Sequence, residues 1–148
     1  MMLPAQEPKV RRDLVCYLAR KIGSDPLRLV GPTPFEITAI ANRTGEVVGA
    51  VYYTNFRGNS IEMGWAGEKG WLTRGNLAAM FGYPFLQLGV QRVWGLVHRH
   101  NKPSRALAEK LGCRVVGVAD GEYGPGQDAI IYSMTRDACR WIKEKADV

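Results

Sequence analysis

The sequence has few cysteines and no long apolar run, and each shortage excludes a class of protein. Its three cysteines, Cys16, Cys113 and Cys139, are an odd number and lie far apart in the 148 residues. We therefore expect reduced thiols rather than a disulfide framework or a zinc site. No apolar run approaches the length of a membrane span, and the start of the chain contains no apolar stretch of the secretory type. These features predict a cytoplasmic protein without a metal and without membrane association.

Acidic residues are also in short supply relative to basic ones. The chain carries 20 Lys and Arg against 14 Asp and Glu, a formal net charge of +6. Such a charge fits nucleic acid, an anionic ligand or solubility alone. The basic residues are scattered, and no helix-turn-helix, zinc or RNA-binding signature accompanies them. A nucleic-acid-binding protein is therefore the least favoured interpretation of the sequence.

The apolar periodicity predicts one domain over residues 1–148, of the mixed α/β class. The expected order is helix 8–22, strands 35–41, 47–55 and 60–66, helix 73–88, strand 92–97, helix 101–111, strands 113–119 and 129–135, and helix 136–146. The first three strands should form an antiparallel meander. A helix joins strands 61–66 and 92–97, so we expect these two to run parallel. Pro84 removes a helical hydrogen bond and should kink its helix near Met80.

The loop 67–72 leads directly from a strand into a helix, with Thr73 as the expected N-cap. The first N–H groups of a helix lack helical partners, and the helix dipole is positive there. A strand, loop and helix in this order are typical of a phosphate site. Lys69 and Arg74 would supply charge, while the N–H groups of residues 72–75 would cradle the phosphate.

Three runs of sequence resemble the GCN5-related N-acetyltransferases: FLQLGVQRV (85–93), NKPS (101–104) and EKLGC (109–113). They are most similar to the ribosomal-protein-alanine branch, and residues 71–74 and 83–85 look like small acetyltransferases encoded by phages and prophages. The resemblance spans about residues 35–135. It implies the acyl-CoA N-acyltransferase fold, a mixed and mostly antiparallel sheet flanked by helices, in which the parallel strands splay apart around acetyl-CoA.

The resemblance also implies which residues bind acetyl-CoA. The thioester and pantetheine would lie along strand 61–66, the pyrophosphate on the following loop, and Asn101 beside the pantetheine or phosphate. The implied set is Met63, Gly64, Trp65, Lys69, Gly70, Trp71, Leu72, Thr73, Arg74, Gly75, Asn101 and Ser104.

Two departures from the family pattern stand out. Ala66, Lys69 and Trp71 align with the usual arginine and two glycines of the phosphate loop, and Gly70 is out of register. The bulk of Trp71 would keep the backbone away from a phosphate. Ala108 replaces a tyrosine that protonates the leaving thiolate, so that Ser104 or a water would serve, or no acid is needed.

Acetyl transfer requires a neutral amine, so a base or a chain of waters must take a proton from an ammonium group. Glu62 is the first candidate base, on the strand face that it shares with Gly64 and Ala66. The competing interpretation is that Glu62 is simply an exposed residue of the strand, without a catalytic role. His98 is the second candidate base; with His100 it makes only a weak metal signal, and both are more simply loop residues. By resemblance, a backbone N–H near Gly64 or Trp65 would hold the oxyanion.

The sequence therefore predicts an N-acetyltransferase that moves an acetyl group from acetyl-CoA to a primary amine by direct attack in a ternary complex. The acceptor, a protein or a small molecule, stays open. A homodimer is common in the family. A catalytically inactive binding module of the same fold is the alternative, which the altered loop and the missing tyrosine motivate.

Overall fold

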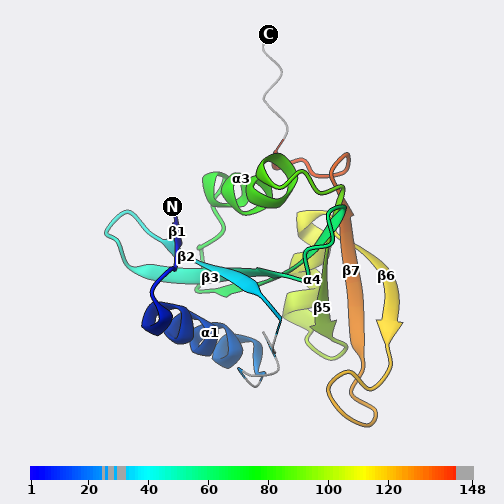
Figure 1. Ribbon diagram of the computed structural model, residues 1–148. Helices are drawn as coiled ribbons and strands as arrows, with labels where there is room; N and C mark the ends of the chain where they lie inside the picture. Colours follow the sequence, from blue (N-terminus) through cyan, green and yellow to red (C-terminus); the bar gives the residue numbers. More distant parts are fainter. Residues whose placement is uncertain (25, 27–28, 30–32, 143–148) are drawn as a thin grey trace.

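The computed structural model of the chain describes residues 1–24, 26, 29 and 33–142. Its elements are β1 (Met2–Pro4), α1 (Pro8–Ile22), β2 (Phe35–Ala41), β3 (Val47–Thr54), β4 (Ser60–Gly67), α3 (Arg74–Gly82), the π-helical turn η1 (Tyr83–Gln87), β5 (Arg92–His98), α4 (Lys102–Leu111), β6 (Arg114–Ala119) and β7 (Ala129–Thr135). The strands form one sheet in the order β1-β2-β3-β4-β5-β7-β6. α1 covers one face of this sheet and α3 lies over the other (Figure 1). The mixed, mostly antiparallel architecture confirms the expected fold.

β4 and β5 are the one parallel pair among the described strands, as the sequence predicted. Their register runs through Ser60↔Arg92, Ile61↔Val93 and Glu62↔Trp94 and then stops, although both strands continue. At Gly95 the backbones come close, because an added Cβ would lie 2.7 Å from the carbonyl oxygen of Met63. Beyond this contact the two strands separate, so the expected splay is present.

The separation leaves backbone groups of β4 without a strand partner on one side. Hydrogen-bonding groups alternate between the two edges of a strand. The N–H of Glu68 donates to Val48 next to β3, whereas the carbonyl of Asn59 accepts the N–H of Arg92 next to β5. Even-numbered residues of β4 therefore direct their backbone groups toward β3, and odd-numbered ones toward β5. The N–H groups of Trp65 and Gly67 consequently face the gap beyond the last paired residue.

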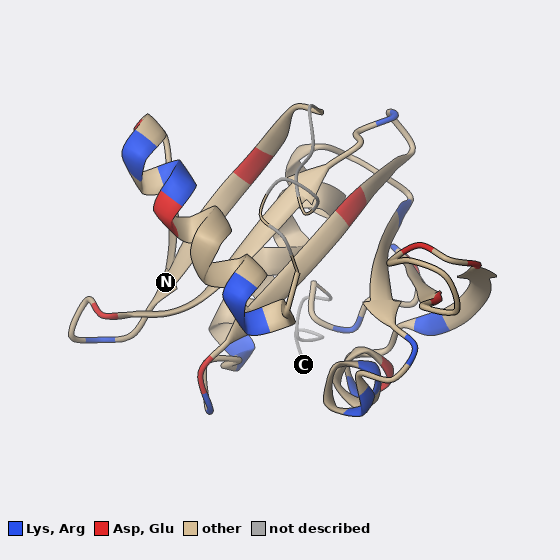
Figure 2. Ribbon diagram, turned by 90° about the horizontal axis from the view of Figure 1, so that it is seen from below, with Lys and Arg blue, Asp and Glu red and all other residues tan. Residues whose placement is uncertain are grey.

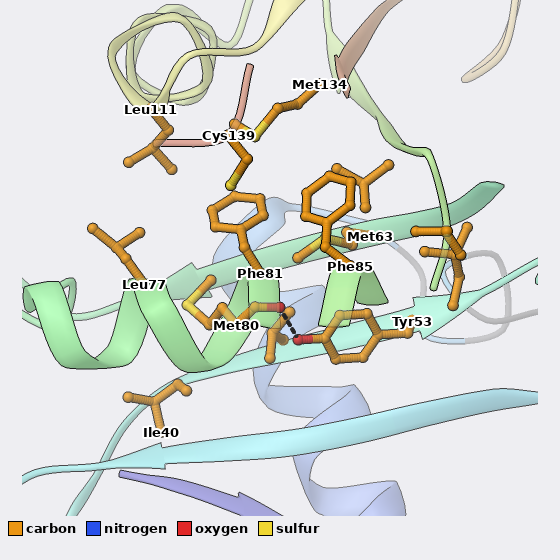
Figure 3. Close-up of a cluster of buried hydrophobic side chains, with 14 of the residues drawn as sticks. Ile40, Tyr53, Met63, Leu77, Met80, Phe81, Phe85, Leu111, Met134 and Cys139 are labelled. Carbon is orange, nitrogen blue, oxygen red and sulfur yellow. Dashed lines mark hydrogen bonds between the residues drawn. The ribbon is translucent and has the colours of Figure 1, made fainter. Parts of the chain in front are cut away.

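The helix predicted over 73–88 is present as α3 followed by η1, in which the N–H of Leu88 donates to the carbonyl of Tyr83. Pro84 has no N–H for the carbonyl of Met80, one turn earlier. The Tyr53 hydroxyl donates to that carbonyl at 2.6 Å instead, inside the core (Figure 3). Thus the proline is accommodated by a π-helical turn and a tyrosine from β3.

Two parts of the chain differ from the sequence predictions. β1 was not expected; it pairs antiparallel with β2. The terminal helix predicted over 136–146 is wrong for residues 136–142, which form turns, and residues 143–148 lie outside the described chain. Trp141 there donates its indole N–H to the carbonyl of Leu111 at 2.8 Å, which fixes the segment against α4. Within the described residues, no helix is both long and apolar enough to cross a membrane.

Candidate active site between the splayed strands

The gap between β4 and β5 opens into a cavity of about 1000 Å³. Its walls are formed by residues 62–67 of β4, residues 93–98 of β5, one side of α4, the end of α1, and the loop between β6 and β7. Buried apolar residues of β4, Ile61 and Met63, belong to the core on the α3 side. Glu62 points to the opposite face, as the predicted alternation required, and lines the cavity.

Glu62 is buried, with 8% of its surface exposed, and both of its carboxylate oxygens are hydrogen-bonded. The Tyr52 hydroxyl donates to Oε2 at 3.2 Å, and the Asn55 side-chain amide donates to Oε1 at 2.9 Å. Burial raises the pKa of Glu62, the two hydrogen bonds oppose the rise, and the negative charge of Glu122 adds to it. The interpretation of Glu62 as an exposed strand residue is therefore wrong, while its role as a base stays a prediction.

Local backbone features bring both donors to Glu62. A Cβ on Gly64 would lie 2.0 Å from Cε1 of Tyr52, so the tyrosine ring occupies the space of the missing side chain and lies along β4. Asn55 has a φ of 54° and is the only non-glycine residue with positive φ in the described chain. Asparagine tolerates this left-handed conformation better than most residues. Sequence reasoning missed both donors and placed Asn55 at a strand end.

His98 is held by the loop between β6 and β7. Its Nδ1 accepts the N–H of His100 at 3.1 Å, so its ring hydrogen is on Nε2, which lies 2.8 Å from Oε1 of Gln127. Its ring stacks on Tyr123 with centroids 5.1 Å apart. Both ring nitrogens are thus engaged in holding the loop, and the role of His98 as the second candidate base stays a prediction. Among the described residues, no three His, Cys, Asp or Glu side chains gather as a metal site would require.

The expected N-cap of the phosphate loop is confirmed. The Thr73 hydroxyl accepts the N–H of Asn76 at 3.1 Å and begins α3. The ring of Trp71 packs across Gly49 and Gly67; a Cβ at either glycine would lie 2.4 Å from the ring. Its side chain is therefore turned onto the sheet and buried, which leaves the backbone of the loop exposed beside α3.

A second hollow, of about 570 Å³, lies beside this loop. Lys69 and Arg74 line it, as do two basic residues that sequence reasoning did not select, Lys110 and Arg140. Glu68, the one carboxylate among the described residues that line it, is paired with Lys21 at 2.6 Å. The arrangement suits an anion such as a diphosphate. Elsewhere in the described part of the chain, Lys and Arg are spread over several elements and form no continuous stripe of the kind that binds nucleic acid (Figure 2).

The start of α4 borders the first cavity. The Asn101 Oδ1 accepts the N–H of Ser104 at 3.2 Å, so this asparagine is the N-cap of α4. Ser104 and Ala108 both line the cavity. Ala108, at the position of the missing tyrosine, packs with Ile130 and Tyr132. α4 therefore presents a small apolar residue where the family pattern has a phenol.

A family profile described as an acetyltransferase (GNAT) domain matches residues 9–114, more than half of the chain. The chain belongs to the GNAT acetyltransferases. No curated protein sequence matches it. The order of its strands and the splayed parallel pair are thus those of a GNAT domain.

Several solved structures share this GNAT fold. A spermidine N-acetyltransferase SpeG F149G mutant from Vibrio cholerae matches with a TM-score of 0.72 and 13% identity, covering 97% of this chain and 96% of that one. Mycobacterium smegmatis RimJ in complex with CoA-disulfide matches with a TM-score of 0.59 and 22% identity, covering 70% and 54%. A GCN5-related N-acetyltransferase from Brucella melitensis matches with a TM-score of 0.59 and 23% identity, covering 70% and 52%. The chain spans less than two thirds of the length of several structures that it matches.

Proposed function

We propose that this GNAT domain transfers an acetyl group from acetyl-CoA to a primary amine, which attacks directly within a ternary complex. The observation that carries the proposal is the buried Glu62, hydrogen-bonded by Tyr52 and Asn55, at the gap where β4 and β5 separate. A carboxylate in this position can take the proton that an ammonium group must lose.

The residues around the gap fit acetyl-CoA, which would supply an activated acyl group as a thioester. The strand 63–65 would run beside its pantetheine arm, with the N–H groups of Trp65 and Gly67 as unpaired donors. The diphosphate would be held by the N–H groups of Leu72, Arg74 and Gly75, with Thr73 as the cap. The N–H of Thr73 itself donates to the carbonyl of Trp71 at 3.2 Å. Lys69 and Gly70, with Arg74, border the same hollow. The bound CoA-disulfide of the RimJ structure supports this choice of coenzyme.

Glu62 would act as the general base. Burial raises its pKa, which makes it a stronger base than an ordinary exposed carboxylate. The Tyr52 hydroxyl and the Asn55 amide hold the two carboxylate oxygens of Glu62 in fixed positions, so that the carboxylate is oriented when it accepts a proton. The N–H of Trp65 would stabilise negative charge that develops on the carbonyl oxygen. Ser104, or a water near Ala108, would protonate the leaving thiolate.

Calorimetry and a thiol-release assay test the proposal in two steps. Acetyl-CoA is titrated into the full chain, and release of CoA thiol is then followed with a panel that includes spermidine and a peptide with a free N-terminus. We expect binding, followed by release with at least one amine. Replacing Glu62 by Gln should leave binding intact and slow transfer by about 10²–10⁴-fold. Glu46→Gln, in an exposed hairpin, is the matched control and should change neither.

The outcomes separate the alternatives. Binding without release above background with every amine would indicate an inactive binding module. An absence of heat at millimolar acetyl-CoA would contradict the whole proposal. Full activity of the Glu62→Gln variant would remove Glu62 as the base and leave the coenzyme site standing.

A further inference from the structure

The loop between β6 and β7 forms one wall of the cavity that contains Glu62. Three of its side chains, Glu122, Tyr123 and Gln127, line this cavity. The loop is anchored on β5, because the ring of Tyr123 stacks on His98 and Oε1 of Gln127 lies 2.8 Å from Nε2 of that histidine. Within the loop, the N–H of Tyr123 donates to the carbonyl of Gln127 at 2.9 Å. Glu122 is therefore carried into the wall of the cavity by a loop that is hydrogen-bonded in place.

Negative charge exceeds positive charge at this cavity. Glu62 and Glu122 are the two carboxylates among the described residues that line it. Both hydrogen bonds to Glu62 come from neutral donors, and Glu122 forms no ion pair within the described chain. Lys21, the one Lys or Arg in the described lining, is already paired with Glu68 at 2.6 Å. The two histidines of the lining belong to a residue type that is mostly neutral above pH 7.

The two carboxylates also act on each other. The negative charge of Glu122 contributes to the raised pKa of Glu62, so it lies close enough for the two charges to repel. A ligand with one positive charge would balance only one of them, and a ligand with a carboxylate of its own would be repelled by Glu122. Apolar side chains make up much of the remaining lining, among them Trp65, Trp94 and Leu96, and such a lining suits methylene groups. Two positive charges joined by an apolar chain fit this pattern best.

We propose that the amine acceptor is a small molecule with a second ammonium group, joined to the first by a short apolar chain, and that Glu122 binds this second positive charge. The inference rests on the proposed function, because it takes Glu62 as the place of the reacting amine. The reacting ammonium group gives one proton to Glu62. Its nitrogen forms a C–N bond with the acetyl carbonyl carbon while the C–S bond of the thioester breaks, and its second proton balances the one that the CoA thiol takes up. The other ammonium group keeps its charge throughout.

Putrescine and butylamine, a diamine and a monoamine of four carbons each, test this inference. Release of CoA thiol is followed with the full chain, acetyl-CoA and each amine in turn. We expect kcat/KM to be about fivefold higher for putrescine, the upper range of the effect that an exposed pair of opposite charges gives. The difference should lie in KM, because the second ammonium group contributes to binding rather than to the chemical step.

Variants of the loop then test the role of Glu122. Glu122→Gln should reduce the ratio of kcat/KM between putrescine and butylamine to about one, because the charge that distinguishes them is removed. Asp120→Asn is the matched control and should keep the wild-type ratio, since Asp120 is exposed between the same two strands but does not line the cavity. Glu122→Lys should instead favour γ-aminobutyrate, in which a carboxylate replaces the second ammonium group. Circular dichroism of each variant verifies that it is folded.

Each outcome decides a separate point. Equal kcat/KM for the two amines in the wild-type chain overturns the second charge, and a preference for putrescine that survives Glu122→Gln overturns the role of Glu122. Faster release with a peptide that has a free N-terminus and no basic side chain overturns the choice of a small diamine. An absence of release with every amine contradicts the proposed function instead. Calorimetry of the two amines with the CoA-bound chain then decides the role of Glu122: tighter binding of putrescine that Glu122→Gln abolishes supports it, and equal binding overturns it.

Discussion

Removing either hydrogen-bond donor from Glu62 should make this carboxylate harder to ionise. Tyr52→Phe deletes the hydroxyl that donates to Oε2, and Asn55→Gly deletes the amide that donates to Oε1. Glycine is chosen at position 55 because it tolerates the φ of 54° that asparagine adopts there. Both donors favour the charged form, and their removal therefore raises the pKa of Glu62 beyond the rise that burial already causes.

The magnitude follows from the strength of these bonds. A hydrogen bond to a charged group contributes about 1.5–3 kcal/mol, and a tenfold change in proton affinity corresponds to about 1.4 kcal/mol. Each substitution should therefore increase the proton affinity of Glu62 about tenfold, with a smaller effect where water replaces the lost donor. The bond of Asn55 is the shorter of the two, so Asn55→Gly should have the larger effect.

The assay is a ¹³C NMR titration of the Glu62 side-chain carboxyl in the free protein, with Glu62→Gln to assign the signal. It requires no substrate and so does not depend on the acceptor. Tyr17→Phe is the matched control, because it removes the same kind of bond from the half-exposed Glu68 and should leave the Glu62 midpoint unchanged. In turnover, the acid limb of kcat/KM should move to higher pH in the two site variants. A Glu62 midpoint that stays in place in both variants would refute the reasoning.

Three further predictions concern the fold and the coenzyme site. Glu62→Gln should increase the free energy of unfolding at neutral pH. The pKa of Glu62 is raised in the folded protein, so the wild-type chain loses stability as the pH rises through that pKa and the carboxylate becomes charged. Urea unfolding should show that the difference between variant and wild type disappears in acid. Tyr53→Phe should cost about 1–3 kcal/mol by leaving the Met80 carbonyl unpaired, but less in a Pro84→Ala background, where residue 84 regains an N–H; equal costs in both backgrounds would disprove this pairing. Lys69→Ala and Arg74→Ala should each raise the KM for acetyl-CoA roughly tenfold with little change in kcat, whereas Arg57→Ala, in the β3–β4 turn, should change neither; an unchanged KM in the first two would exclude them from the coenzyme site.

Regular patterns in the sequence predicted most of the sheet. Apolar periodicity located α1, and strand alternation placed Glu62 opposite Ile61 and Met63. The helix between β4 and β5 indicated that the two strands are parallel. The separation of these strands was implied by the family resemblance rather than by the residues. No local sequence pattern indicates where the hydrogen bonding between two neighbouring strands ends.

The features that were missed depend on contacts between distant residues. Tyr52 and Asn55 meet Glu62 only because Gly64 leaves room for a ring and Asn55 takes a left-handed backbone. Residues 136–142 were predicted as a helix but form turns, and Trp141 bonds to the carbonyl of Leu111 at the end of α4. Tertiary contacts of this kind override local propensity.

The central claim is that the gap between β4 and β5, with the loop before α3, binds acetyl-CoA. Backbone amide NMR of the full chain during a titration with acetyl-CoA tests it most directly. We expect the signals of Trp65, Gly67 and residues 73–75 to shift together with one affinity, while those of β6 stay in place. Saturation with coenzyme that leaves Trp65 and Gly67 unshifted, or shifts confined to another surface, would contradict the account.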